Sequence, residues 1–183
     1  QYVSPIDSDL KKPKPEVFEM ETHFRKSGAQ FRNIDLDRYE EELEGVYTFC
    51  LGAFSNNPFF SPISRQSFMD KYMPIRRFID PRFVLIAEDS NGKLIGTLFA
   101  IQDFLNLEEK SLVIKTIGRD NSAQWRGMGN VMINLIYRQA IAENFESVIH
   151  AYMSKDSIPN RISADYTGVP FKEYVLYELA LTE

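Results

Sequence analysis

Apolar residues recur along the chain at spacings that predict its main helices and one hairpin. They fall at steps of three, four or seven over residues 39–54 and again over 128–145, as one buried face of a helix requires. Two apolar runs, 83–89 and 94–101, flank Asn91-Gly92. Asn-Gly between two such runs is the strongest short-range signal for a β-hairpin. Periodicity alone therefore predicts two helices and a pair of strands.

The other segments are predicted from turn residues and local composition. Prolines and lysines punctuate residues 1–15, so we expect a linker or an extension without regular structure there. Val17–Phe24 and Gln30–Ile34 are expected to be extended and joined by a turn at Gly28. The remaining expected elements are strands at 111–119, 147–152 and 174–181, a helix at 158–165, and a helix that runs from Ser61 or Ser64 toward Phe78 with an irregularity at Pro74.

The composition is that of one globular domain, with or without an extension. The 183 residues are 44% hydrophobic, which is enough for a core. A net charge of −5 predicts no basic surface for nucleic acid or an anionic membrane. No apolar run approaches the ~20 residues that span a bilayer, and the single cysteine excludes an intrachain disulfide. We expect a cytoplasmic protein without nucleic-acid or membrane partners.

The chain begins with Gln1 rather than Met. We interpret residues 16–183 as a domain cut from a longer protein, with 1–15 as the linker that precedes it.

The run Gln124-Trp125-Arg126-Gly127-Met128-Gly129 lies between the predicted strand 111–119 and the second helix. Two glycines remove the Cβ atoms that would keep the backbone away from an anion, and a helix that begins there presents unpaired N–H groups. The loop is therefore predicted to hold a phosphate. A Rossmann loop would need a third glycine, and a P-loop would need Gly-Lys-Ser/Thr; neither follows here.

The spacing Gln-x-x-Gly-x-Gly at 124–129 resembles the cofactor motif of the GNAT superfamily of acyl-CoA-dependent N-acyltransferases. The resemblance extends over roughly residues 30–183 in the order of the predicted elements. It implies an α+β fold with a mixed, mostly antiparallel twisted sheet flanked by helices. It also implies acetyl-CoA, or another acyl-CoA, as the co-substrate.

The resemblance implies a set of site residues. The pantetheine would bond to the main chain at the end of the motif strand, and the pyrophosphate to the backbone of the loop and of the helix start. The cofactor-binding residues are then Ile117, Gly118, Arg119, Gln124, Trp125, Arg126, Gly127, Met128, Gly129 and Asn130. The family's proton donor to the departing thiolate is often a tyrosine near the end of the last helix. Ala164 stands at the matching position here, so the candidate is Tyr166, the nearest tyrosine, with Tyr174 and Tyr152 as the alternatives. The family usually has an apolar residue where Arg119 stands.

Other candidate groups carry weaker signals. Glu88 and Asp103, at strand ends, are candidates for a general base that acts directly or through water. His150 is expected to be a core histidine, and Cys50, on the apolar stripe of the first helix, a small core residue rather than a nucleophile. Two distant histidines and one cysteine have no usable ligand spacing, so we assign no metal.

The function that we predict is transfer of an acetyl or another short acyl group from acyl-CoA to an amine, by direct attack. The alternative is a GNAT-like acyl-CoA-binding module without catalysis, within a larger protein. The acceptor, a small molecule or a peptide, and the oligomeric state are left open by the sequence.

Overall fold

A computed structural model describes residues 2–10, 15–57, 60–154, 168–175 and 177. The strands form a mixed sheet in the order β2-β3-β4-β5-β6-β1-β7, and β8 pairs with β1 off this path. Their bounds are β1 Tyr2–Asp7, β2 Gln30–Asn33, β3 Val84–Glu88, β4 Leu94–Gln102, β5 Ser111–Arg119, β6 Ser147–His150, β7 Met153–Ser154 and β8 Val169–Tyr174. Among these pairs only β5–β6 is parallel. The expected α+β fold with a mostly antiparallel sheet is confirmed.

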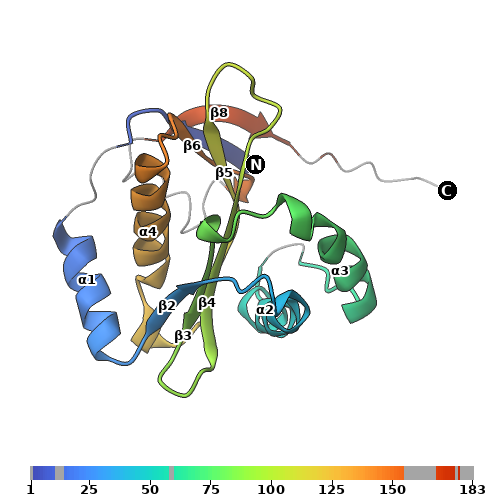
Figure 1. The fold of residues 1–183 in the computed structure, drawn as a ribbon, viewed down its shortest axis with the longest axis vertical. Helices are drawn as coiled ribbons and strands as arrows, with labels where there is room; N and C mark the ends of the chain where they lie inside the picture. The colour runs from blue at the N-terminus through green and yellow to red at the C-terminus, as the bar shows by residue number, and fades with distance from the viewer. Residues whose placement is uncertain (1, 11–14, 58–59, 155–167, 176, 178–183) are drawn as a thin grey trace.

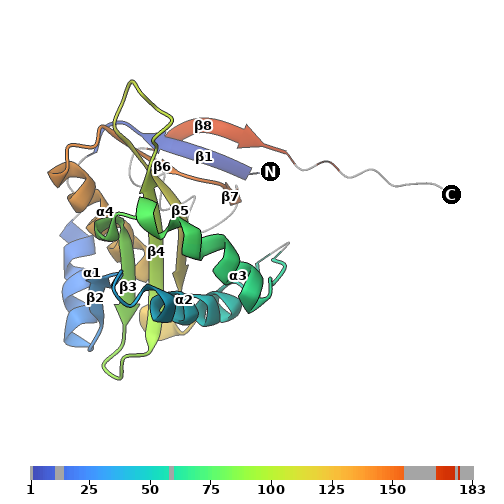
Figure 2. The same ribbon diagram turned by 45° about the vertical axis from the view of Figure 1, so that its right-hand side comes forward.

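Helices cover both faces of the sheet, as Figures 1 and 2 show. The α-helices are α1 Pro15–Lys26, α2 Tyr39–Ala53, α3 Arg65–Tyr72 and α4 Met128–Ala142. One core cluster lies between the sheet and α1 and α4, and includes Phe24, Leu98 and Met132. A smaller cluster joins α2 and α3 to the other face around Leu43 and Ile86. None of the helices over the described residues is long and apolar enough to cross a membrane.

The strongest periodic signals are confirmed. The hairpin turns at Gly92, whose φ is 76°, and the helix predicted over 128–145 is α4, with eight buried side chains. The helix expected from Ser61 or Ser64 begins after Ser64, whose side chain accepts a hydrogen bond from the Ser67 N–H. It changes to a 3₁₀ helix, Met73–Phe78, where Pro74 removes a backbone donor.

The segment Val17–Phe24 is helical, so the expectation of an extended segment there is wrong. It belongs to α1, which begins at Pro15 and packs beside α4. Val17, Met20 and Phe24 are spaced by three and four and face the core, a period that belongs to a helix. The helix ends in a turn at Gly28 (φ 92°), where the Ala29 N–H bonds to the Phe24 carbonyl at 2.9 Å. The predicted turn at Gly28 is confirmed.

The first and last described strands, β1 and β8, pair with each other in the sheet. Tyr2–Asp7 is strand β1, so the expectation of no regular structure within residues 1–15 is wrong. β1 pairs antiparallel with β6, β7 and β8, and its proline, Pro5, lies opposite Pro170 of β8 next to a register shift. The last described strand is β8, Val169–Tyr174, which begins earlier than the expected strand 174–181 because it pairs with β1. Residues 176 and 178–181 of that expected strand lie outside the described residues.

Candidate functional site

Strand β5 has a full neighbour on only one side. It pairs with β4 from Leu112 to Arg119, but with β6 only over its first half, up to Ile114 opposite His150. We call residues 115–119 the open segment, because no described strand pairs with its second edge. An unpaired strand edge presents N–H and C=O groups that can bond an extended ligand.

The closed half of β5 is held to β6 by buried polar contacts. The hydroxyls of Ser111 and Ser147 lie 2.8 Å apart, and the Ala151 N–H donates to the Ile114 carbonyl at 2.9 Å. His150 is buried, and its Nε2 lies 2.9 Å from Tyr137 Oη of α4. Burial lowers the pKa of His150 to about 4, so this side chain is neutral at pH 7. His150 is a core histidine, as predicted.

Arg119, at the end of the open segment, organises the loop that follows. Its Nη1 donates to the carbonyl of Asp120 at 2.6 Å and to that of Ser122 at 3.5 Å. The Asp120 carboxylate accepts from the Ser122 N–H at 2.9 Å and pairs with Lys93 at 3.3 Å. The Ser122 N–H, and then Lys93, hold the pKa of Asp120 below its usual value. Arg119, which stands where the resembled family usually has an apolar residue, thus bonds to the loop that follows the strand.

The N-terminus of α4 lies directly after this loop. Gly127 is its N-cap residue, with φ 95° and no side-chain hydrogen bond to cap the helix. Its carbonyl already accepts the N–H of Asn130 at 3.0 Å. Helix N-termini without a capping side chain attract anions through their N–H groups and the helix dipole. This arrangement fits a phosphate group.

The predicted cofactor residues lie in two nearby stretches, 117–119 and 124–130, separated by residues 120–123. Ile117, Gly118 and Arg119 end the open segment. The loop and the helix start then supply Gln124, Trp125, Arg126, Gly127, Met128, Gly129 and Asn130. The side chains of Trp125 and Met128 are buried in the core, so only their main chains can face a ligand.

Gly127 also allows close packing of α1 against the start of α4, which the sequence did not indicate. A Cβ on this residue would lie 2.5 Å from Met20 Sδ of α1, and its positive φ strains any other residue. Gly127→Val would therefore disturb the contact between α1 and α4 as well as the loop.

Aromatic rings cover the open segment on its α2 side. A Cβ on Gly118 would lie 3.0 Å from Phe54 Cζ and 3.2 Å from Phe49 Cε1. The ring centroids of Phe54 and Phe60 are 6.4 Å apart. We call Phe49, Phe54 and Phe60 the aromatic wall. Its position follows from long-range packing, and only the density of aromatic residues near 49–60 hinted at it.

The two candidate general bases already accept hydrogen bonds within the fold. Both carboxylate oxygens of Glu88, on β3, accept hydrogen bonds from Arg32, which also pairs with Glu42 of α2. Asp103 follows β4 at the end where β5 begins, and accepts the Leu105 N–H at 3.0 Å. These contacts give both carboxylates structural partners.

The candidate proton donor Tyr166 and the predicted helix 158–165 lie outside the described residues. The alternatives belong to an aromatic cluster at the β1 end of the sheet: Tyr152 stacks on Tyr2 at 4.8 Å and meets Tyr174 edge-on at 5.0 Å. Tyr174 Oη also accepts a hydrogen bond from Ser4 at 3.2 Å.

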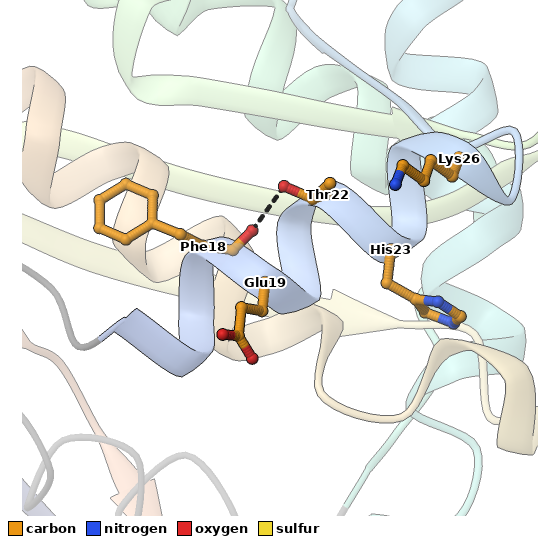
Figure 3. A pocket seen from close by; sticks show the side chains of 5 residues that line it. All are labelled: Phe18, Glu19, Thr22, His23 and Lys26. Atoms are coloured by element: carbon orange, nitrogen blue, oxygen red, sulfur yellow. Dashed lines mark hydrogen bonds between the residues drawn. The ribbon is translucent and has the colours of Figure 1, made fainter.

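Two cavities were found among the described residues, each of about 370 Å³. One adjoins the motif loop, and its polar lining includes Gln124, Ser122 and Lys93. The other runs along α1. Figure 3 shows its lining side chains, Phe18, Glu19, Thr22, His23 and Lys26. Neither cavity is lined by a residue of the open segment.

No protein-family model matches the chain, and no curated protein matches it in sequence. Several solved structures share its architecture. A GCN5-related N-acetyltransferase from Sphaerobacter thermophilus aligns with 93% of the chain at a TM-score of 0.62 and 15% identity. The chain has the GNAT fold. A GCN5-related glucosamine N-acetyltransferase region of a fungal multi-domain GH3 β-N-acetylglucosaminidase covers 88% of it, with a TM-score of 0.60 and 15% identity.

These two proteins are longer than the chain, which spans 48% of the first and 19% of the second. An aminoglycoside acetyltransferase from an uncultured soil metagenomic sample is closer in size. The match covers 84% of this chain and 97% of that one, with a TM-score of 0.57 and 14% identity. Acetyltransferases thus recur among the structures that share this fold.

Proposed function

We propose that the chain is an N-acyltransferase that moves an acetyl or another short acyl group from acyl-CoA to an amine by direct attack. One observation carries the proposal: the uncapped N-terminus of α4 follows, after a short loop, a strand whose second edge is paired with no described strand beyond Ile114. The first feature suits a pyrophosphate, and the second suits the extended, amide-bearing pantetheine. That the solved structures with this fold include acetyltransferases supports the proposal.

The residues that would hold acyl-CoA are those of the two stretches 117–119 and 124–130. The main chain of Ile117–Arg119 would bond to the pantetheine, and that of Gln124–Asn130 to the pyrophosphate, beside the exposed guanidinium of Arg126. Acyl-CoA supplies the thioester: the amine nitrogen gains a C–N bond, the C–S bond breaks, and the proton lost by the amine ends on sulfur. No metal is part of this proposal.

The chain's own groups would act in three ways. A main-chain N–H near Ile117 would stabilise the negative charge that develops on the carbonyl oxygen. Tyr166 would donate the proton to the thiolate. The aromatic wall would disfavour a charged ammonium and so keep the attacking amine neutral. We place the reaction in the cytoplasm, with a small-molecule or peptide amine as acceptor and without nucleic-acid or membrane partners.

Calorimetric titration with acetyl-CoA, followed by thiol release across an amine panel, tests the proposal. Wild-type protein should bind acetyl-CoA and release thiol with at least one amine. Gly129→Val should lower the affinity for acetyl-CoA by roughly tenfold or more, because a side chain would keep the backbone away from the phosphates. Arg126→Glu should also lower it, because it reverses an exposed charge next to the anion.

Gly45→Val is the matched control for the glycine substitution. A Cβ at Gly45 on α2 meets nothing within 4 Å, so this variant should bind like wild type. Unchanged affinity in both Gly129→Val and Arg126→Glu would contradict the loop assignment. Bound acetyl-CoA without thiol release for any amine would favour the non-catalytic binding module.

A further inference from the structure

The loop between β4 and β5 exposes three large apolar side chains. Leu105 and Leu107 are 93% and 92% exposed, and Phe104 is 57% exposed. We call these three residues the apolar tip. Figures 1 and 2 show the loop projecting beyond the end of the sheet. Single exposed apolar residues are common on soluble proteins, but a group of them at a projecting position indicates a contact surface.

The loop is held in this conformation by its own polar side chains. The Asp103 carboxylate accepts the Leu105 N–H at 3.0 Å. The side-chain oxygen of Asn106 accepts the Glu108 N–H at 3.1 Å, and its side-chain nitrogen donates to the Ser111 hydroxyl at 3.1 Å. A loop that is already ordered loses little conformational entropy when it binds, so its leucines can be buried in a contact without a large entropic penalty.

A second exposed apolar surface lies on η1, the 3₁₀ helix that follows α3. Met73 and Phe78 are 37% and 50% exposed at the two ends of this helix. The Arg77 guanidinium lies over the Phe78 ring, 4.6 Å from its centroid. We call these three residues the η1 patch. The Arg76 side chain fixes the helix to the body of the protein, because it donates to the Leu36 carbonyl at 2.8 and 3.0 Å.

The two surfaces carry opposite charges. Glu108 and Glu109 follow the last leucine of the tip and are exposed, and Arg77 is exposed on the patch. No ion pair among the described residues involves any of these three side chains. Carboxylates beside an apolar tip favour a partner surface that is apolar and basic, and they disfavour an anionic membrane. The chain itself carries an apolar and basic surface on η1.

Both surfaces belong to the same end of the sheet. η1 leads through the short helix Pro81–Phe83 into β3, whose first residue, Val84, pairs with Phe99 of β4. The apolar tip begins at Phe104, shortly after β4 ends at Gln102. Both surfaces stay exposed in the single chain. A twofold axis near this end can bring the tip of each copy to the patch of the other, so that the contact forms twice.

We infer that two copies of the chain associate about a twofold axis, with the apolar tip of each copy packed on the η1 patch of the other. Each contact buries leucine side chains against Phe78 and places Glu108 and Glu109 near Arg77. Because the contact forms twice, it counts twice toward the roughly 1,200 Å² that a specific interface buries. The inference does not depend on the proposed acyl transfer, since neither surface includes a residue of the motif loop or of the open segment.

Sedimentation velocity of the full chain over a range of concentrations tests the association. Wild type should form a dimer with a dissociation constant in the micromolar range. A chain that stays monomeric up to about 1 mM would overturn the inference. Larger assemblies or filaments would contradict the twofold arrangement. Flotation with phosphatidylcholine vesicles tests the other use of an apolar tip: a monomer that binds these vesicles through Leu105 would overturn the inference in favour of a membrane.

Substitutions then locate the interface. Leu105→Asp on the tip and Phe78→Asp on the patch should each raise the dissociation constant of the dimer by about tenfold or more, because each places a charge in an apolar contact. Tyr177→Asp is the matched control, because Tyr177 is 88% exposed and belongs to neither surface. It should dimerise like wild type. A dimer that survives a folded Leu105→Asp protein unchanged, or that Tyr177→Asp abolishes, would overturn the assignment.

Mixing the two variants tests whether the tip meets the patch or another tip. A homodimer of Leu105→Asp or of Phe78→Asp has two damaged contacts. A mixed dimer has one intact contact and one that is damaged on both sides, and a contact that is already lost cannot be lost twice. The mixture should therefore associate more tightly than either variant alone. No gain on mixing would overturn the pairing of tip with patch.

Charge exchange tests the same pairing without removing apolar groups, and it does not rely on the folding of Phe78→Asp. Arg77→Glu should weaken the dimer severalfold, because it places like charges together. Glu108→Arg with Glu109→Arg, added to the same chain, should restore the association. If Arg77→Glu has no effect, or if the added arginines do not restore the dimer, the charge pairing is wrong.

Discussion

The two halves of β5 both contain β-branched residues but have different surroundings. Residues Ser111–Ile114 are paired on both edges, and Leu112 and Ile114 are buried in the main core. Residues 115–119 keep β4 on one edge, and no described strand pairs with the other. The difference shows that a binding edge arises from the point at which a neighbouring strand stops, and not from strand propensity.

Local irregularities accompany the change between the halves. The β4–β5 register shifts between Phe99 and Ala100, so that Lys115 has no direct partner on β4. Such bulges bend a strand and re-aim its side chains. On the other side, β6 ends at His150, whose contact with Tyr137 holds that end to α4. Substitutions in the closed half should therefore change stability, and those around the open segment should change binding or turnover.

The largest effect is expected for Tyr166, to which the proposed mechanism assigns the proton transfer. Tyr166→Phe keeps the ring and removes the proton, so turnover should fall by about 10² to 10⁴ while acetyl-CoA affinity stays the same. Steady-state kinetics and calorimetry measure the two quantities. Tyr152→Phe and Tyr174→Phe are the controls, because their rings already belong to the cluster with Tyr2. Full turnover in Tyr166→Phe would transfer the donor role to one of these residues or to water.

Gly127 is an exception to this division, because it lies in the motif loop and yet its substitution should lower the stability of the fold. We expect Gly127→Val to lower the free energy of unfolding by about 2 to 4 kcal/mol, from its positive φ and the contact with Met20. Chemical denaturation measures this loss. Met20→Ala in the same chain should recover part of it by removing the clash. If Gly127→Val is as stable as wild type, the assigned packing between α1 and α4 is wrong.

His150, opposite the closed half of β5, should make the stability of the fold depend on pH. Its folded pKa, about 4, lies below the ordinary value of 6.5 because burial disfavours its charged form. The unfolded chain therefore binds a proton first as the pH falls, so this stability is present above pH 6.5 and is lost toward pH 4. The loss amounts to about 3 kcal/mol.

Urea unfolding of wild type and His150→Gln across this pH range measures the effect. The variant should be less stable at pH 7 and should lack this part of the pH dependence. His23→Gln is the control variant, because it removes a histidine from an exposed position on α1. A His150→Gln protein with the wild-type pH dependence would assign the effect to another group.

Cys50 should give the smallest effect. It lies on α2 beside Phe49, and burial raises the pKa of its thiol to about 11, so the thiol is protonated at neutral pH. Cys50→Ala should lower stability by roughly 1 to 2 kcal/mol through lost packing and leave turnover unchanged. Loss of all turnover in a folded Cys50→Ala protein would point to an acyl-cysteine intermediate instead of direct attack.

Local signals determined a large part of the fold. The 3.6-residue period predicted α2 and α4, Asn91-Gly92 predicted the β3–β4 hairpin, and the strand over 111–119 has the predicted bounds. The paired glycines marked the start of α4. These features depend on neighbours a few residues apart, so periodicity and turn chemistry are sufficient to predict them.

Tertiary structure alone decided the rest, because it depends on residues far apart in the chain. β1 forms a strand despite Pro5 because β6 and β8 supply partners for it. α1 is a helix because Met20 and Phe24 find a core to pack against. The open segment exists because β6 stops pairing at His150, and the aromatic wall exists because the end of α2 crosses β5 at Gly118. No local pattern encodes where two strands part or which helix face reaches them.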